Sequence, residues 1–136
     1  MVVPTDFSEG AQQAIERALW LPLGPKSKVT LLHVLPHDIP GRLRKEAFIE
    51  ADRNLSKALA RVGQLAAQRG LNPRQFAPDV VEGAAPEQIL KRAHTVEADV
   101  ICMGRHGRSS LLQLRLGSTA LKVVRHGDVP VLLVRS

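Results

Sequence analysis

The stretch MGRHGRSSLLQLRLGSTALKVV, residues 103–124, decides how the second half of the chain is interpreted. Gly104 and Gly107 come directly after the apolar run ADVICM, and Gly117 precedes a segment whose apolar residues have helical spacing. Glycine permits a sharp turn and leaves room for a ligand against the main chain. We therefore interpret this stretch as the end of a buried strand, a glycine-rich loop and the start of a helix.

Apolar strands and helices alternate outward from this stretch along the whole chain. Expected strands cover 1–4, 28–34, 75–82, 98–103 and Val129–Val134, and expected helices follow Ser8, cover 43–69 and begin at Pro86 and Ser118. Strands that are apolar throughout are typical of a parallel sheet with helices on both faces. Pro78 predicts an edge position for the third strand, because proline cannot donate to the ladder. The predicted fold class is α/β, one doubly wound, Rossmann-like domain over residues 1–136.

Composition limits the classes of protein to consider. The chain has 136 residues, of which 44% are hydrophobic, and a net charge of +6. No apolar run reaches the roughly 20 residues that span a bilayer, and no secretory signal is evident. With one cysteine, Cys102, which we expect to be a buried, inert thiol, these features predict a cytoplasmic protein. The positive net charge favours an anionic partner, which could be nucleic acid, a phosphorylated small molecule or anionic lipid.

The candidate ligand site lies at the carboxyl ends of the strands, where doubly wound sheets bind ligands. Backbone N–H groups near Gly104 and Gly107 could form an anion-binding nest, and Gly117 and Ser118 would open a helix with free N–H groups. No Asp or Glu occurs between residues 100 and 127. The pattern predicts a phosphate cradle; in the alternative, the glycines serve only as turns and Ser118 only as a cap.

Several segments carry a resemblance to a known family. The segments PTDFSEGAQQAIERAL, LLHV and VPVLLV, and MGRHG followed nine residues later by GST, resemble the universal stress protein family and its signature G-x2-G-x9-G-[ST]. The resemblance implies a five-stranded parallel sheet of order 3-2-1-4-5. It also implies ATP binding, although ADP or AMP is not distinguished, together with Mg²⁺ and a homodimer formed through the last strand, Val129–Val134.

The same resemblance assigns roles to residues of this chain. It implies that Pro4, Thr5, Asp6 and Val34 hold the adenosine end, that Met103, Gly104 and Gly107 lie along the ribose and first phosphates, and that Gly117, Ser118 and Thr119 meet the outer phosphates. Arg105, His106 and Arg108 lie in the glycine-rich loop and complete the candidate site. No catalytic residue is assigned, because no nucleophile with a base and an orienting group is recognisable.

Three functions are compared. The first is an ATP-binding stress-response module that regulates a protein partner and hydrolyses ATP slowly or not at all. The second is an ATPase or nucleotidyl-transfer enzyme, which lacks a candidate base. The third is a nucleic-acid-binding basic protein, which is less favoured because one Trp, three Phe and no Tyr provide few stacking platforms. A metal site at His33 and His37 is not favoured either, because Pro36 between them precludes helical geometry.

Overall fold

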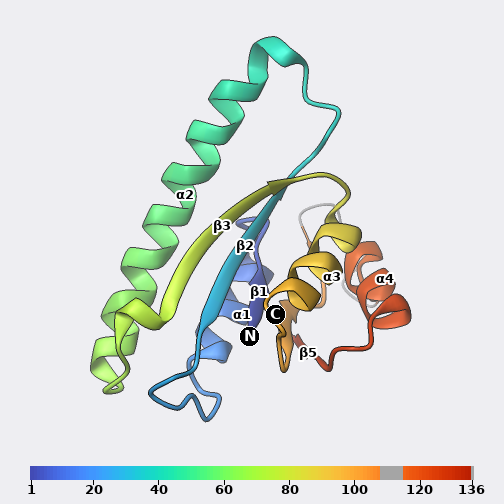
Figure 1. Cartoon of the computed structure of the whole chain (residues 1–136). Coiled ribbons are helices and arrows are strands. Elements are labelled where there is room, and N and C mark those ends of the chain that lie inside the picture. The colour runs from blue at the N-terminus through green and yellow to red at the C-terminus, as the bar shows by residue number, and fades with distance from the viewer. Residues whose placement is uncertain (108–114, 136) are drawn as a thin grey trace.

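Strands and helices alternate in the computed structural model, which describes residues 1–107 and 115–135 (Figure 1). Along the chain the elements are β1 (Val2–Pro4), α1 (Glu9–Ala18), β2 (Val29–Leu35), α2 (Gly41–Gln68), the short 3-10 helix η1 (Pro73–Gln75), β3 (Phe76–Glu82), α3 (Ala85–Thr95), β4 (Ile101–Gly104), α4 (Ser118–His126) and β5 (Val131–Val134). The predicted α/β alternation is confirmed.

The five strands form one parallel sheet of order β3-β2-β1-β4-β5. This is the order 3-2-1-4-5 that the family resemblance implied. β3 is an edge strand, as Pro78 predicted, and its pairing with β2 continues from Phe76 to Glu82. A proline fits such a strand when its nitrogen faces the open edge. The chain order reverses between β1 and β4, which makes their carboxyl ends the switch point of the sheet.

Successive strand residues send their side chains to opposite faces of the sheet. Val3, Leu31 and Cys102 pack in the core under α1 and α2, whereas Val2 and Leu32 pack in the core under α3 and α4. The two helix layers are visible on opposite sides of the sheet in Figure 1. Because both faces are covered, both alternating sets of side chains must be apolar, which explains the continuous apolar strands in the sequence.

Helix ends follow the predicted capping signals. The hydroxyl of Ser8 accepts the N–H of Ala11 at 3.2 Å and caps α1, as expected. Gly70 ends α2 in the left-handed conformation, with φ of 72°, and the N–H of Leu71 reaches back to the carbonyl of Ala66 at 2.8 Å. That pattern is a Schellman motif, which favours glycine at this position.

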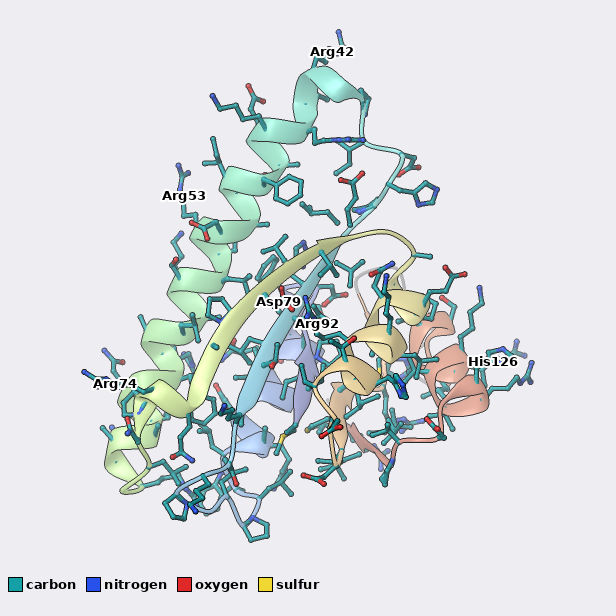
Figure 2. The ribbon with its side chains drawn as sticks, viewed as in Figure 1. Arg42, Arg53, Arg74, Asp79, Arg92 and His126 are labelled. Atoms are coloured by element: carbon teal, nitrogen blue, oxygen red, sulfur yellow. The ribbon has the colours of Figure 1, made fainter. Side chains whose placement is uncertain are left out.

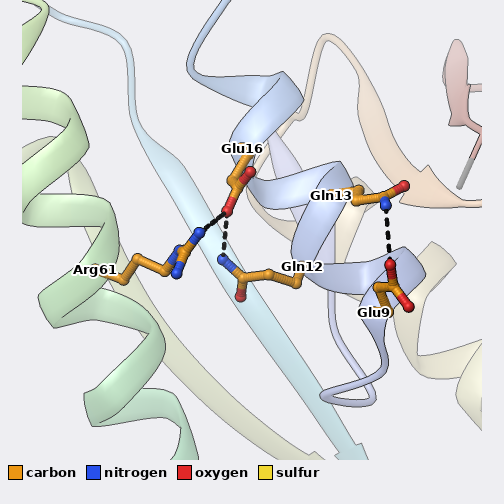
Figure 3. Close-up of polar contacts among 5 residues, drawn as sticks. All are labelled: Glu9, Gln12, Gln13, Glu16 and Arg61. Carbon is orange, nitrogen blue, oxygen red and sulfur yellow. Dashed lines mark hydrogen bonds and ion pairs between the residues drawn. The ribbon is translucent and has the colours of Figure 1, made fainter.

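Ion pairs connect the layers at the surface. On one face, Arg61 of α2 reaches Glu16 of α1 at 2.6 Å (Figure 3), and hydrogen bonds from Gln12 and Arg61 lower the pKa of the Glu16 carboxyl. On the other, Arg92 of α3 points toward Asp79 of β3 at 2.5 Å (Figure 2). Exposed ion pairs contribute about 0–1 kcal/mol each, so the apolar layers carry most of the stability.

Strand and helix boundaries differ from the predictions by a few residues. β5 begins at Val131 rather than at residue 129, because the carbonyl of Pro130 makes the first bond, to the N–H of Ile101 at 2.8 Å. β4 likewise begins at Ile101 rather than at residue 98, and α2 begins at Gly41 rather than at residue 43. In the described part of the chain, no helix combines the length and apolarity needed to cross a membrane.

The buried thiol of Cys102 offers a test of the core. Burial raises its pKa to about 11, and its Sγ lies 3.5 Å from the carbonyl of Ala14. Near pH 8 about one thiol in a thousand would be ionised. We expect Ellman's reagent to leave the native protein unmodified for hours and to titrate one thiol immediately after unfolding in guanidinium chloride. Rapid reaction of the native protein would contradict this packing.

Candidate functional site

A cavity of about 500 Å³ opens where β1 and β4 end, at the switch point of the sheet. Twelve of the thirteen residues predicted for the site line it: Pro4, Thr5, Asp6, Val34, Met103, Gly104, Arg105, His106, Gly107, Gly117, Ser118 and Thr119. The thirteenth, Arg108, lies outside the described residues. Segments more than a hundred residues apart in the sequence therefore meet around one space.

The turn between β1 and α1 forms one wall of the cavity. Thr5 is 6% exposed; its N–H donates to the carbonyl of Leu32 at 2.8 Å, and its Oγ1 accepts the N–H of Phe7 at 3.1 Å. Oδ1 of Asp6 accepts the N–H of Ser8 at 3.0 Å, so Asp6 organises the turn before α1. Phe7 has a φ of 63°, a left-handed backbone that bulky residues rarely adopt.

The signature glycines allow protein segments to approach one another closely. A Cβ on Gly104 would lie 2.9 Å from the backbone C and O of Gly10, in the first turn of α1. One on Gly107 would lie 2.7 Å from Oδ2 of Asp6, and one on Gly117 would lie 3.0 Å from the carbonyl of Arg105. These distances are below normal contact for a Cβ, so a larger residue would push the cavity walls apart.

This packing corrects two expectations about the loop. The position that a Cβ of Gly104 would occupy is filled by α1, so the missing side chain serves this contact, and the residue also lines the cavity. In addition, the left-handed glycines of the described residues are Gly70 and Gly83, so neither Gly104 nor Gly107 has the left-handed backbone that alternates with right-handed residues in a nest. The glycines therefore shape the cavity indirectly, through the contacts between its walls.

The first turn of α4 lies at the cavity and has no side-chain cap among the described residues. Gly117 is the N-cap residue and has no side-chain cap, so the idea that Ser118 caps the helix is wrong. The first helical bond runs from Leu121 to the carbonyl of Gly117 at 2.9 Å. The N–H groups of Ser118, Thr119 and Ala120 thus lack helical partners, and all three residues line the cavity. Such an end of a helix attracts anions.

The cavity lining has more basic than acidic residues. Among the described residues, the lining includes Arg105, Arg115 and His106, and one residue with a carboxylate, Asp6. Sequence analysis did not assign Arg115 to the site, although its place in the acid-free stretch was a usable signal. It also missed the other lining residues: Ala11, Leu32, Ala85, Ile89, Leu116 and Ala120. Those from α1, β2 and α3 carry no local signal, because only the packing of these elements brings them to the cavity.

A doubly wound parallel sheet with a cavity at its switch point defines the class of protein: an α/β fold that places its ligand between the two halves of the sheet. The sequence model of the Universal stress protein family matches residues 1–135. The chain therefore belongs to the universal stress protein family.

Individual relatives agree with this assignment. Universal stress protein G of Shigella flexneri is 30% identical over 99% of this chain and 97% of its own length. Universal stress protein MJ0577 of Methanocaldococcus jannaschii is 26% identical over 99% of this chain and 93% of its own. A solved structure of MJ0577 superposes with a TM-score of 0.84, at 27% identity and over 99% and 94% of the two chains.

Two further solved structures share the fold at lower identity. A universal stress protein in complex with cAMP has a TM-score of 0.72 at 24% identity, over 99% of this chain and 95% of its own. A family protein from Arabidopsis thaliana with AMP bound has a TM-score of 0.58 at 15% identity, over 98% and 88%.

The contact between Gly104 and Gly10 can be tested through stability. Gly104→Ala should destabilise the protein by about 1–3 kcal/mol, because the added methyl group overpacks the contact with α1. The matched control is Gly41→Ala at the start of α2, where a Cβ meets nothing within 4 Å. That change should be neutral or stabilising by up to about 1 kcal/mol. Urea unfolding measures both, and equal effects would contradict the close packing.

Proposed function

We propose that the cavity binds ATP together with Mg²⁺, and that the protein is a nucleotide-dependent stress-response module that regulates a protein partner. The observation that carries the proposal is the uncapped first turn of α4, which lines a cavity that also has an apolar region. Val34, Leu32 and Ile89 contribute that region from β2 and α3. β2 and β4 lie on opposite sides of β1, so Leu32 and Val34 are separated by the first strand from the glycine-rich loop that follows β4.

This arrangement suits an adenine nucleotide. Its volume of about 500 Å³ lies within the ordinary range of ligand pockets. The proposal places the adenosine end at Pro4, Thr5, Asp6 and Val34, the ribose and first phosphates along Met103, Gly104 and Gly107, and the outer phosphates at Gly117, Ser118 and Thr119. Arg105 and Arg115 would supply positive charge around the phosphates, and His106 would lie beside them. Two solved structures of this fold are described with cAMP and AMP; those ligands belong to those proteins and are consistent with the proposed ligand class.

Magnesium would be held mainly by the nucleotide. Within the described residues, no three His, Cys, Asp or Glu side chains are grouped where they could bind a metal ion. Mg²⁺ commonly keeps several waters and takes its remaining ligands from phosphates and one or two protein oxygens. The hydroxyls of Ser118 and Thr119 are suited to that role, because both residues line the cavity at the proposed phosphate end. The ion would neutralise part of the phosphate charge.

A regulatory role follows from the chemistry of the lining. Among the described lining residues, Asp6 is the carboxylate, and its Oδ1 already accepts the N–H of Ser8. The imidazole of His106 is the other lining group that could act as a base, and the sequence shows no recognisable set of nucleophile, base and orienting group. Slow hydrolysis at most is therefore proposed, with the bound nucleotide selecting among surface states that a partner distinguishes. We place the protein in the cytoplasm, which agrees with Cys102 as a free, buried thiol.

Nucleotide binding can be tested directly. The purified protein is denatured, any released nucleotide is identified, and ATP with Mg²⁺ is then titrated into the stripped, refolded protein by calorimetry. Wild type should bind, whereas Gly117→Val should lose at least about tenfold in affinity, because its Cβ would meet the carbonyl of Arg105 at 3.0 Å and displace the start of α4.

The matched control is Gly24→Val, whose Cβ would lie at an ordinary 3.8 Å from Oγ of Ser27. It should bind ATP as wild type does. A folded wild-type protein that bound no adenine nucleotide would refute the proposal. ATP-insensitive DNA binding with a steep salt dependence would favour the basic surface, where Arg42 and Arg53 project from α2 (Figure 2), as the functional site.

We also propose a homodimer through the last strand. β5 is an edge strand of the sheet. The carbonyls of Pro130, just before β5, and of Val134, at its end, accept the N–H groups of Ile101 and Arg105 at 2.8 and 3.0 Å, so both point toward β4. By alternation, Val131 and Leu133 direct their backbone groups to the open edge. The adjoining α4 exposes Leu121 and Val124 by 41% and 45%, which adds apolar surface beside this edge.

Leu133→Pro tests this dimer, because proline removes an outward N–H and leaves the ladder with β4 intact. We expect sedimentation equilibrium to give a dimer for wild type and a monomer for the variant. Leu133→Val keeps the N–H and should remain dimeric. A monomeric wild type, or a fully dimeric proline variant, would exclude pairing through this edge.

A further inference from the structure

We propose that His33 and Phe7 are positioning residues that hold Thr5 and Asp6 in place for the adenosine end of the nucleotide. The proposal rests on the nucleotide-binding function proposed above. It is based on three contacts around the turn between β1 and α1. Neither His33 nor Phe7 lines the cavity, so both would act through the residues that do.

His33 reaches the turn from the opposite face of the sheet. It lies on β2, where Leu31 packs under α1 and α2 and Leu32 lines the cavity on the other face. Because side chains alternate along a strand, His33 shares the face of Leu31. Its Nδ1 lies 2.8 Å from the carbonyl oxygen of Thr5. A carbonyl oxygen only accepts hydrogen bonds, so Nδ1 must carry the hydrogen in this contact.

Phe7 connects this histidine to the strained part of the turn. Its ring stacks on the imidazole of His33, with centroids 4.5 Å apart and planes tilted by 32°. Its own N–H donates to Oγ1 of Thr5 at 3.1 Å. Phe7 has a φ of 63°, and a bulky residue stays in such a conformation only where its surroundings impose it. The stacked ring and the Thr5 hydrogen bonds are those surroundings.

The two ends of the proposed nucleotide would therefore depend on different elements of the fold. The His33–Phe7 pair determines the conformation of Thr5 and Asp6, which belong to the proposed adenosine end. The proposed phosphate end is built from Gly117, Ser118 and Thr119 on the separate element α4. Losing the pair should therefore weaken recognition of adenosine and leave recognition of the triphosphate unchanged. A general loss of folding would weaken both.

Two substitutions of His33 separate its hydrogen bond from its ring. His33→Phe keeps a ring beside Phe7 but removes the donor. His33→Asn removes the ring but keeps a donor, because the amide nitrogen of Asn occupies the same place along the side chain as Nδ1 of His. Affinities for ATP with Mg²⁺, adenosine and inorganic tripolyphosphate with Mg²⁺ are measured by calorimetry, and folding is checked by circular dichroism.

We expect His33→Phe to lower the affinities for ATP and for adenosine by the same factor, about two- to tenfold for one lost hydrogen bond. The affinity for tripolyphosphate should be unchanged. His33→Asn should recover most of the loss. Phe7→Ala probes the same turn from its other contact and should also weaken adenosine selectively, which keeps the test available if His33→Phe does not fold. The matched control is His37→Phe, an exposed histidine in the loop after β2, which should bind as wild type does.

The outcomes separate the two proposals. If wild type binds ATP and folded His33→Phe and Phe7→Ala bind adenosine as tightly as wild type, the positioning role is overturned and the nucleotide site stands. Equal losses for adenosine and tripolyphosphate would also overturn it, because they indicate a general structural effect. A folded wild type that binds no adenine nucleotide would overturn both proposals.

Discussion

The close approach of α1 to the loop after β4 is the constraint on which the cavity depends. Gly10 and Gly104 meet without side chains, and a Cβ on Gly10 would itself lie 3.0 Å from the carbonyl of His106. Glycine inside a helix is unfavourable by roughly 0.5–1 kcal/mol relative to alanine, so Gly10 is retained at a cost in helix propensity. The contact brings the glycine-rich loop against the first turn of α1. In that position the loop places the carbonyl of Arg105 next to Gly117, at the start of α4.

The first turns of α1 and α4 differ in their N-terminal capping. Ser8 satisfies the first turn of α1 from within the chain, and Asp6 satisfies the N–H of Ser8. Among the described residues α4 has no such cap, and the residues of its first turn line the cavity. An unsatisfied helix start is costly when it is buried and useful when a ligand completes it. α3 also begins at the cavity without a side-chain cap, so the basic residues Arg105 and Arg115 are needed, beside the start of α4, to argue for the proposed phosphate end.

Much of the fold followed from local patterns. Continuous apolar strands predicted a parallel sheet covered on both faces, Pro78 predicted the edge position of β3, and Ser8 predicted the start of α1. The strand order came from the family resemblance, because periodicity does not state which strands are neighbours. The start of β5 was misplaced by two residues, since pairing depends on which carbonyl first meets β4 and not on where the apolar run begins.

The sequence by itself determined which segments form strands, helices and glycine turns, because these depend on side-chain periodicity, capping residues and backbone freedom within a few positions. It also indicated which loops border the cavity, since the carboxyl ends of parallel strands meet at one edge, and the family resemblance assigned most of the individual residues. Only the tertiary structure decided what the glycines do and how Thr5 is held. Gly104 faces Gly10, and His33 reaches the carbonyl of Thr5, through contacts between elements far apart in the chain. Such contacts depend on differences of about a few tenths of an ångström in packing distance, and these differences leave no periodic pattern in the sequence.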